Sequence, residues 1–314
     1  MQRLGPFLLM AALLAPISMA EARPPKTFSV DCDRKHAGTI SDAIDRAQGG
    51  DTILLSGTCT ETLSIAKAIT LDGQGTASLA PSDPADVTIT TQEELVRILG
   101  LRLESPANVQ IAVGLGSQAF VNGCTVRNGA TAGMTATAGG FLIATDNVIS
   151  ENATGVFVVD GARGRFGLRL LTDVVASPNT ISGNLTNGIT IAQNGSADIV
   201  GNSISQNDIG VVVTEGARAR VTANTISENR IGLFQSTHAS VNLASPAPAA
   251  NPLFEIPNDG AAPPQLAIIC AGGSLSGRVG GFLPAIRTQP TPGTLTGAPL
   301  PAPPFTFCED VTVP

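Results

Sequence analysis

Apolar and polar positions alternate through much of the chain, most clearly between residues 147 and 244. Short runs such as Ile189-Thr190-Ile191 place a β-branched residue at every second position. Because successive side chains of a strand point to opposite faces, this pattern predicts short, half-buried strands. The repeats lack the i, i+3, i+4, i+7 spacing of an amphipathic helix. We therefore predict an all-β structure for this region.

The predicted strands belong to a sequence repeat of about 22 residues. Three consecutive copies read NTISGNLTNGITIAQNGSADIVG, NSISQNDIGVVVTEGARARVTA and NTISENRIGLFQSTHASVNLA, at residues 179–201, 202–223 and 224–244. A fourth copy opens at Asn147 with NVISENATGVFVV. A short strand cannot bury its apolar side alone, so the equivalent strands of successive copies must stack about 4.8 Å apart. The repeat therefore predicts a solenoid.

Stacking aligns the equivalent residues of successive copies into columns. Two inward columns are expected, Ile149, Ile181, Ile204, Ile226 and Val156, Ile189, Val211, Leu233. A third column holds Asn152, Asn184, Asn207 and Asn229. Asparagine tolerates the left-handed backbone that a corner needs, and its amide can bond to the neighbouring copies. A glycine column follows each corner, where a side chain would crowd the bend, at Gly155, Gly188, Gly210 and Gly232.

Strand and corner repeats of this length with an asparagine ladder resemble the right-handed parallel β-helix of the pectin-lyase-like superfamily. Residues 28–75 are similar to the entry turns of secreted members, with a helix followed by Gly-Asp-Thr-Ile, Gly-Thr-x-x-Glu and Ile-Thr-Leu-Asp-Gly. The resemblance implies a solenoid of roughly nine coils over residues 23–244, with an N-terminal capping helix. It implies little about activity, because this fold hosts lyases, hydrolases, esterases, epimerases and adhesins.

Both ends of the chain differ from the repeats. Residues 1–22 have the charged start, short apolar centre and small final residues of a secretory signal peptide. Residues 39–48 predict a helix with Thr39 as its N-cap and Gly49-Gly50 after its end. Residues 245–314 are rich in proline and alanine, and we expect a loop-rich segment that packs on the last coils or is partly disordered.

The signal peptide predicts a secreted or periplasmic protein, where cysteines can pair. Cys32 precedes the predicted helix and Cys59 follows the first strand of the coils, so a bridge would tie the cap to the first coil. Cys270 and Cys308 flank the proline-rich stretch and can pair likewise, whereas Cys124 is expected as a buried free thiol. The alternative for each pair is two buried, reduced cysteines.

The catalytic motifs of the superfamily are missing from the sequence. We find neither the calcium-binding carboxylate cluster with a basic arginine that the resemblance implies for lyases, nor the paired aspartates of its glycosidases. The repeat register puts Asp198 in the column of Arg165 and Arg220, which favours cross-strand ion pairs. The same register pairs Asp208 with Arg230.

Two related turns carry the best candidate binding site. They contain Asp160, Arg163 and Arg165 in one copy and Glu215, Arg218 and Arg220 in another. We expect Arg163, Ser196 and Arg218 to share a column that His238 ends, with the carboxylates in the turn beside them. Residues 168–178, with Arg169 and Asp173, are an extra segment that could form a wall. An arginine-lined groove could bind an acidic polysaccharide through bidentate contacts. Alternatively, these turns repeat merely because the coil repeats.

Composition excludes several other partners. His36 and His238 lack further ligands at metal-binding spacing, so we expect neither a metal nor a cofactor. The chain has no Trp and no Tyr, which disfavours stacking on neutral sugars. A formal net charge of −7 without a basic run argues against nucleic acid, and the N-terminal apolar run is too short for permanent membrane insertion.

The sequence thus predicts an exported, non-catalytic β-helix repeat protein associated with extracellular or envelope polysaccharide. One alternative is a lyase, epimerase or hydrolase that acts on an acidic glycan. The other is a structural surface or adhesive protein whose flat sheets bind another protein. The oligomeric state stays open.

Overall fold

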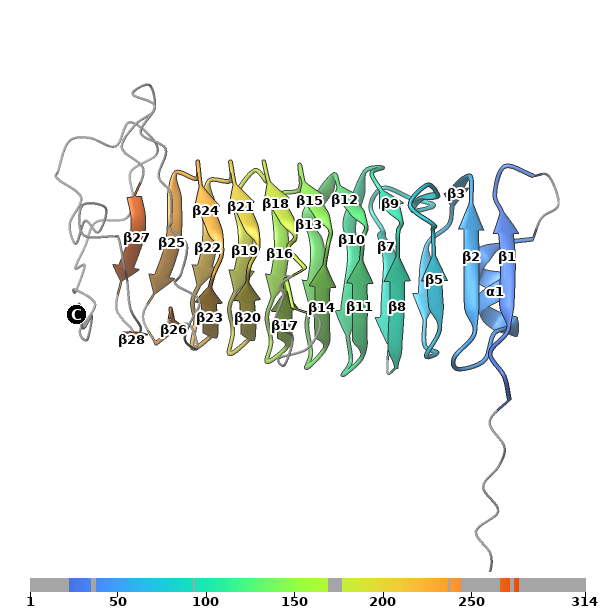
Figure 1. Ribbon diagram of the computed structural model, residues 1–314, viewed down its shortest axis with the longest axis horizontal. Helices are drawn as coiled ribbons and strands as arrows, with labels where there is room; N and C mark the ends of the chain where they lie inside the picture. The colour runs from blue at the N-terminus through green and yellow to red at the C-terminus, as the bar shows by residue number, and fades with distance from the viewer. Residues whose placement is uncertain are drawn as a thin grey trace, which may run out of the picture.

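A computed structural model describes residues 23–34, 38–92, 94–168, 177–236 and 238–243, together with the backbone of two strands at 266–271 and 274–276. Three parallel sheets run along the length of the molecule, and the chain passes through each sheet once per coil (Figure 1). All the strand pairs within the sheets are parallel and join equivalent strands of successive coils, such as β17 (Arg163–Phe166) with β20 (Ser196–Val200). The predicted parallel β-helix is confirmed.

Among the described residues, sheets A, B and C contain eleven, eight and nine strands. Sheet A comprises β1 (Thr27–Asp31), β2 (Thr52–Ser56), β5 (Thr70–Asp72), β8 (Leu95–Leu99), β11 (Gln118–Asn122), β14 (Phe141–Thr145), β17, β20, β23 (Arg218–Thr222), β26 (Ser240–Asn242) and β28 (Ser274–Ser276). Sheet B comprises β3 (Thr58–Thr60), β6 (Ser78–Ala80), β9 (Arg102–Leu103), β12 (Thr125–Arg127), β15 (Val148–Ser150), β18 (Thr180–Ser182), β21 (Ser203–Ser205) and β24 (Thr225–Ser227). Sheet C comprises β4 (Leu63–Ile65), β7 (Val87–Gln92), β10 (Ala107–Gly114), β13 (Gly129–Ala136), β16 (Thr154–Val158), β19 (Asn187–Ile191), β22 (Ile209–Val213), β25 (Ile231–Ser236) and β27 (Leu266–Ala271).

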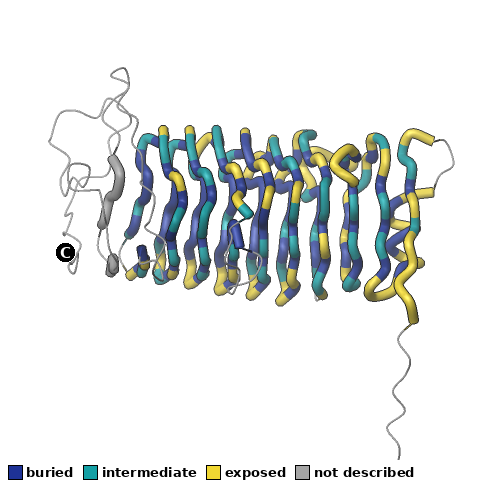
Figure 2. The backbone as a smooth tube through the Cα atoms, viewed as in Figure 1, coloured by how far each residue is buried: buried dark blue, intermediate teal, exposed yellow. Residues whose placement is uncertain are grey.

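The core is the interior of the solenoid, and the predicted inward columns line it. Ile204 pairs with Ile181 on one side and Ile226 on the other, and Ile204 has 0% of its surface exposed. Val211 pairs likewise with Ile189 and Leu233 in sheet C. Buried and more exposed positions alternate along the strands (Figure 2). Each buried aliphatic side chain contributes about 1.5–3 kcal/mol, so the stacked columns stabilise the fold jointly.

Two asparagine ladders hold the corners of sheet B. The expected ladder is present, since Asn184 donates its side-chain amide to the side-chain oxygen of Asn207, at 2.9 Å. A second buried ladder lies at the opposite end of the same strands and comprises Asn147, Asn179, Asn202 and Asn224.

The left-handed backbone at the predicted corner does not fall on the asparagine itself. It falls on the preceding residue, as at Glu151, Gln206 and Glu228, with φ of 59°, 57° and 55°. The asparagine is thereby left free to point its amide into the coil, where it is hydrogen-bonded. The expected glycine column is confirmed at Gly210. A Cβ atom there would lie 2.6 Å from the carbonyl oxygen of Gly232, which is too close for any residue with a side chain.

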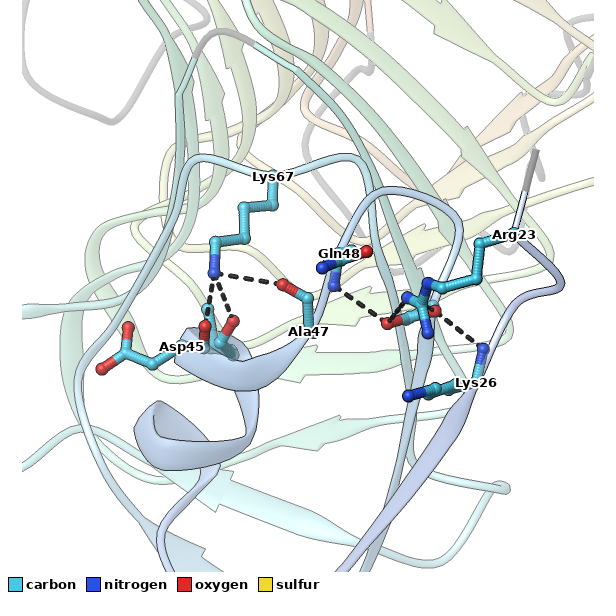
Figure 3. Close-up of polar contacts among 8 residues, drawn as sticks. Arg23, Lys26, Asp45, Ala47, Gln48 and Lys67 are labelled. Carbon is cyan, nitrogen blue, oxygen red and sulfur yellow. Dashed lines mark hydrogen bonds and ion pairs between the residues drawn. The ribbon is translucent and has the colours of Figure 1, made fainter. Parts of the chain in front are cut away.

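Helix α1 (Ile40–Arg46) caps the N-terminal end, and it lies in the crossover from β1 to β2 (Figure 1). Thr39 is its N-cap, as predicted, and forms a capping box with Asp42. The helix ends at Arg46, before the predicted Gln48. The backbone becomes extended at Ala47, with ψ of 150°, and Lys67 Nζ donates to the carbonyl oxygens of Ile44, Asp45 and Ala47 that the end of the helix leaves unpaired (Figure 3).

Strand β1 was not predicted, and it adds a rung before the helix. A disulfide joins Cys32, directly after β1, to Cys59 in β3. Asp51, whose side chain is completely buried, accepts hydrogen bonds from the backbone N–H groups of Lys26 and Gln48 and from Arg23 (Figure 3). The predicted tie between cap and first coil is therefore present, and Asp51 provides a second one.

Strands β27 and β28 pair with β25 and β26, so the parallel stacking continues past the boundary placed at residue 244. Within the described residues, no helix is long and apolar enough to cross a membrane.

Candidate functional site

A groove with a volume of about 520 Å³ crosses the outer face of sheet A over five consecutive strands, β14 to β26. In each of these strands, one set of side chains points into the core and the alternate set points out into the groove. Gly164, Ala197 and Ala219 occupy the inward positions between the groove residues. The outward side chains therefore define the groove.

The outward side chains form two rows that run along the helix axis. The outer row is Phe141, Arg163, Ser196, Arg218 and Ser240, each in direct register with the next. The inner row is Arg165, Asp198, Arg220 and Asn242. The sequence register for the arginines and Asp198 is thus confirmed.

The inner row is internally connected. Asp198 accepts a hydrogen bond from Arg220 Nε at 2.8 Å, and both side chains are more than two-thirds buried. The guanidinium of Arg165 lies 5.4 Å from the ring centroid of Phe141, which is a cation–π contact. These contacts fix the orientation of the inner arginines.

The outer arginines are exposed. Neither Arg163 nor Arg218 forms an ion pair with another described residue, and both are open to solvent. Four arginines and one aspartate leave the described lining with three net positive charges, in a chain whose formal charge is −7. Arginine stays protonated at every physiological pH, so the groove is an electropositive surface on an acidic protein.

The acidic turn residues flank the groove without lining it. Asp160 and Glu215 occupy the turns from sheet C to sheet A, in the left-handed conformation, with φ of 55° and 54°. Both are exposed, and the turns are linked by backbone hydrogen bonds such as Asn194 N–H to the carbonyl of Glu215. The prediction that they lie beside the arginines is correct.

The prediction for His238 is wrong. Ser240, not His238, pairs with Arg218 and ends the arginine column. Gln235 pairs with Val213 in sheet C. Four residues then separate Val213 from Arg218, and four separate Gln235 from Ser240, so the two turns have equal length. His238 therefore corresponds to Gly216, and it shares the left-handed backbone of that turn position, with φ of 66°. Its exposed imidazole belongs to the turn.

Among the outward-facing lining residues, sequence reasoning missed Phe141, Ser240 and Asn242. The apolar run Phe141-Leu142-Ile143-Ala144 has the length of a strand and ends shortly before Asn147, which opens the first recognised copy. Extending the repeat alignment one strand upstream would have placed Phe141 in the arginine column. Arg169 and Asp173, proposed for a groove wall, lie outside the described residues, as do His36, Cys308 and the side chain of Cys270.

The comparisons with known proteins agree with this architecture. Residues 108–248 match the family described as periplasmic copper-binding protein (NosD), and this range includes every groove residue. A comparison with curated proteins finds no match.

Among solved structures, the pectate lyase Pel9A aligns with a TM-score of 0.55 and 11% identity, over 70% of this chain and 70% of that chain. An alginate lyase from Paenibacillus sp. str. FPU-7 aligns with a TM-score of 0.48 and 14% identity, over 80% of this chain and 94% of that chain. The chain is therefore a β-helix repeat protein with the fold expected from its resemblance to the pectin-lyase-like superfamily, and residues 108–248 are similar to NosD.

Proposed function

We propose that this protein is an exported, non-catalytic β-helix protein that binds acidic polysaccharide in the groove of sheet A. The observation that carries the proposal is the pair of exposed arginines, Arg163 and Arg218, in an electropositive groove of an otherwise acidic protein. An arginine guanidinium binds a carboxylate through two parallel hydrogen bonds, which gives both affinity and orientation. A long open groove across several rungs suits a polymer.

Two observations support export. The Cys32–Cys59 disulfide is typical of an oxidising compartment. The matching family is described as periplasmic. Both support our proposal that the protein is exported, with residues 1–22 as its signal peptide, and that it acts in the periplasm, where acidic glycans of the envelope are accessible.

The carboxylates of the groove do not form a hydrolytic pair. Glycoside hydrolysis generally needs two carboxyl groups on opposite sides of the scissile bond. Among the described lining residues Asp198 is the carboxylate, and it is held by Arg220. Asp160 and Glu215 lie on exposed turns beside the groove and do not line it. This favours binding without turnover.

Copper binding, which the name of the matching family states, does not fit the described residues. They contain no group of three or more His, Cys, Asp or Glu side chains that could hold a metal ion. Cys124 is buried in the core, and burial raises the pKa of its thiol to about 12, so the thiol stays protonated. Met134 is likewise fully buried. We assign no copper site to this part of the chain.

A lyase acting on an acidic glycan is the second candidate, favoured by the fold shared with the pectate lyase. One experiment separates the two. Purified protein is titrated with pectate, alginate and neutral dextran at low and high salt, and each mixture is then assayed for unsaturated products and new reducing ends. We expect binding of the polyanions alone, weakening with salt, without product formation. Binding with product release would establish the lyase, and no binding at low salt would refute the proposed function.

A further inference from the structure

The outer row of the groove carries its cations on alternate rungs. Arg163 lies on β17 and Arg218 on β23, and Ser196 of β20 lies between them in direct register. Neighbouring strands of a sheet are about 4.8 Å apart, so the two arginines are separated by about 9.6 Å along the helix axis. The row therefore has a charge period of two rungs.

The middle rung is unfavourable for an anion. Its two outward side chains are Ser196, which is neutral, and Asp198, which is a carboxylate. Asp198 is in contact with Arg220, so that arginine is directed towards the protein carboxylate. An anionic group placed opposite β20 would lie beside Asp198, whereas an anionic group opposite β17 or β23 would face an exposed arginine. Along the helix axis, the groove thus presents the cation of Arg163, the neutral Ser196 and the cation of Arg218.

We infer that the groove selects linear acidic glycans that lie along the helix axis and present a carboxylate on the same side at every second sugar. The inference rests on the proposed function and specifies its ligand. In an extended 1→4-linked chain, successive rings turn opposite sides to a surface, so same-side carboxylates are two sugars apart. That separation is close to the two-rung spacing of Arg163 and Arg218. The intervening sugar offers hydroxyl groups, which match Ser196 at the middle rung.

The inference distinguishes charge spacing from total charge. A glycan of alternating uronate and neutral sugars carries half the charge of a homouronate of equal length, yet both present same-side carboxylates at every second sugar. If spacing decides affinity, the two should bind alike. If total charge decides, the homouronate should bind much more tightly.

Isothermal titration of the purified chain with three defined probes tests this. The probes are hexagalacturonate, a hexasaccharide of alternating glucuronate and N-acetylglucosamine joined only by 1→4 linkages, and the glucuronate–N-acetylglucosamine disaccharide of that same chain. We expect the two hexasaccharides to bind within about threefold of each other and the disaccharide about tenfold more weakly, because it reaches one arginine.

Variants of the outer row sharpen the test. Arg163→Ala and Arg218→Ala should each reduce the affinity for both hexasaccharides about tenfold, to the level of the disaccharide. Ser196→Arg places a cation opposite the middle sugar, whose carboxylate in hexagalacturonate points away from the groove, so the two hexasaccharides should still bind this variant within about threefold of each other. Arg102→Ala is the matched control, since Arg102 is a half-exposed arginine on sheet B, and it should change affinity less than about twofold.

Hexagalacturonate binding to the unaltered protein more than about tenfold tighter than the alternating hexasaccharide would overturn the spacing inference, while leaving the proposed function intact. A disaccharide that binds as well as the hexasaccharides would also overturn it. Absence of binding by every probe at low salt would instead refute the proposed function, and the inference with it.

Discussion

The side-chain amide of Asn207 donates a hydrogen bond to the side-chain oxygen of Asn229 at 2.9 Å, and the same oxygen accepts the backbone N–H of Asn207. Asn207 Nδ2 also donates to the carbonyl oxygens of Ile181 and Ser205. Each asparagine of the ladder thus connects its own corner to the coils on both sides, in a site closed to water. The ladder thus supplies the hydrogen bonds that water would make to the polar groups of an exposed corner.

Asn207→Leu should destabilise the protein by about 2–5 kcal/mol. The leucine keeps the volume but leaves several buried donors and acceptors without partners, each costing about 1–3 kcal/mol. Urea unfolding of the variant measures the loss. Gln206→Ala is the control, because Gln206 is exposed beside the same corner and Ala223 adopts the same left-handed backbone. Equal stability of the two variants would contradict a structural role for the ladder.

Ile204→Asp should prevent the accumulation of soluble, folded protein. Ile204 is fully buried between two other isoleucines, and an unpaired carboxylate there costs several kcal/mol against a marginal total stability. The yield of soluble protein and its far-ultraviolet circular dichroism report the outcome. Ser205→Asp, on the adjacent outward position, should fold normally. A soluble Ile204→Asp variant with unchanged melting would mean that the register is wrong.

Reduction of the Cys32–Cys59 disulfide should weaken the N-terminal cap first. Closing a loop with a sequence separation of 27 residues contributes about 3 kcal/mol by constraining the unfolded chain. Hydrogen exchange should therefore rise in β1, α1 and β2 before it rises in the central coils. Cys32→Ser together with Cys59→Ser should reproduce the effect, and Cys124→Ser should leave exchange in the cap unchanged. Uniform exchange along the solenoid after reduction would argue against a local tie.

The cap should also lose stability in acid through Asp51. Hydrogen bonds from the backbone N–H groups of Lys26 and Gln48, helped by Arg23, lower the pKa of this carboxyl to about 2. A depressed folded-state pKa stabilises the protein above the unfolded value near 3.9, and the contribution disappears as the pH falls from about 4 towards 2. The difference in melting temperature between the unaltered protein and Asp51→Asn should be largest at pH 5 and shrink at pH 2.5. A difference that is constant with pH would exclude Asp51 as the cause.

Much of the fold could be predicted because the copies of the repeat can be aligned with one another within this one sequence. Copies that stack must place equivalent residues in one column, and a slip of one residue would turn every side chain to the wrong face. The alternation around Ile204 therefore fixed the inward columns, and the same alignment brought Asp198 between Arg165 and Arg220. The prediction for His238 failed to follow this alignment, because the last two copies keep an offset of 22 residues throughout, from the pair Ser203 and Thr225 to the pair Arg218 and Ser240.

By itself, the sequence determined the parallel β-helix, the capping helix that begins after Thr39 and the arginine columns, since all of these follow from local pattern or from self-similarity. It left the pairing of Cys32 with Cys59 open, and the structure decided it. Only the tertiary structure decided that Arg23 reaches Asp51, that Lys67 caps α1, and that Phe141 joins the groove. The sequence register predicts an ion pair of Asp198 with its column arginines, and the structure adds that Arg163 and Arg218 stay exposed. The reason is physical: contacts that do not recur from coil to coil leave no period in the sequence, and whether an outward charge is paired depends on the side chains that fold beside it.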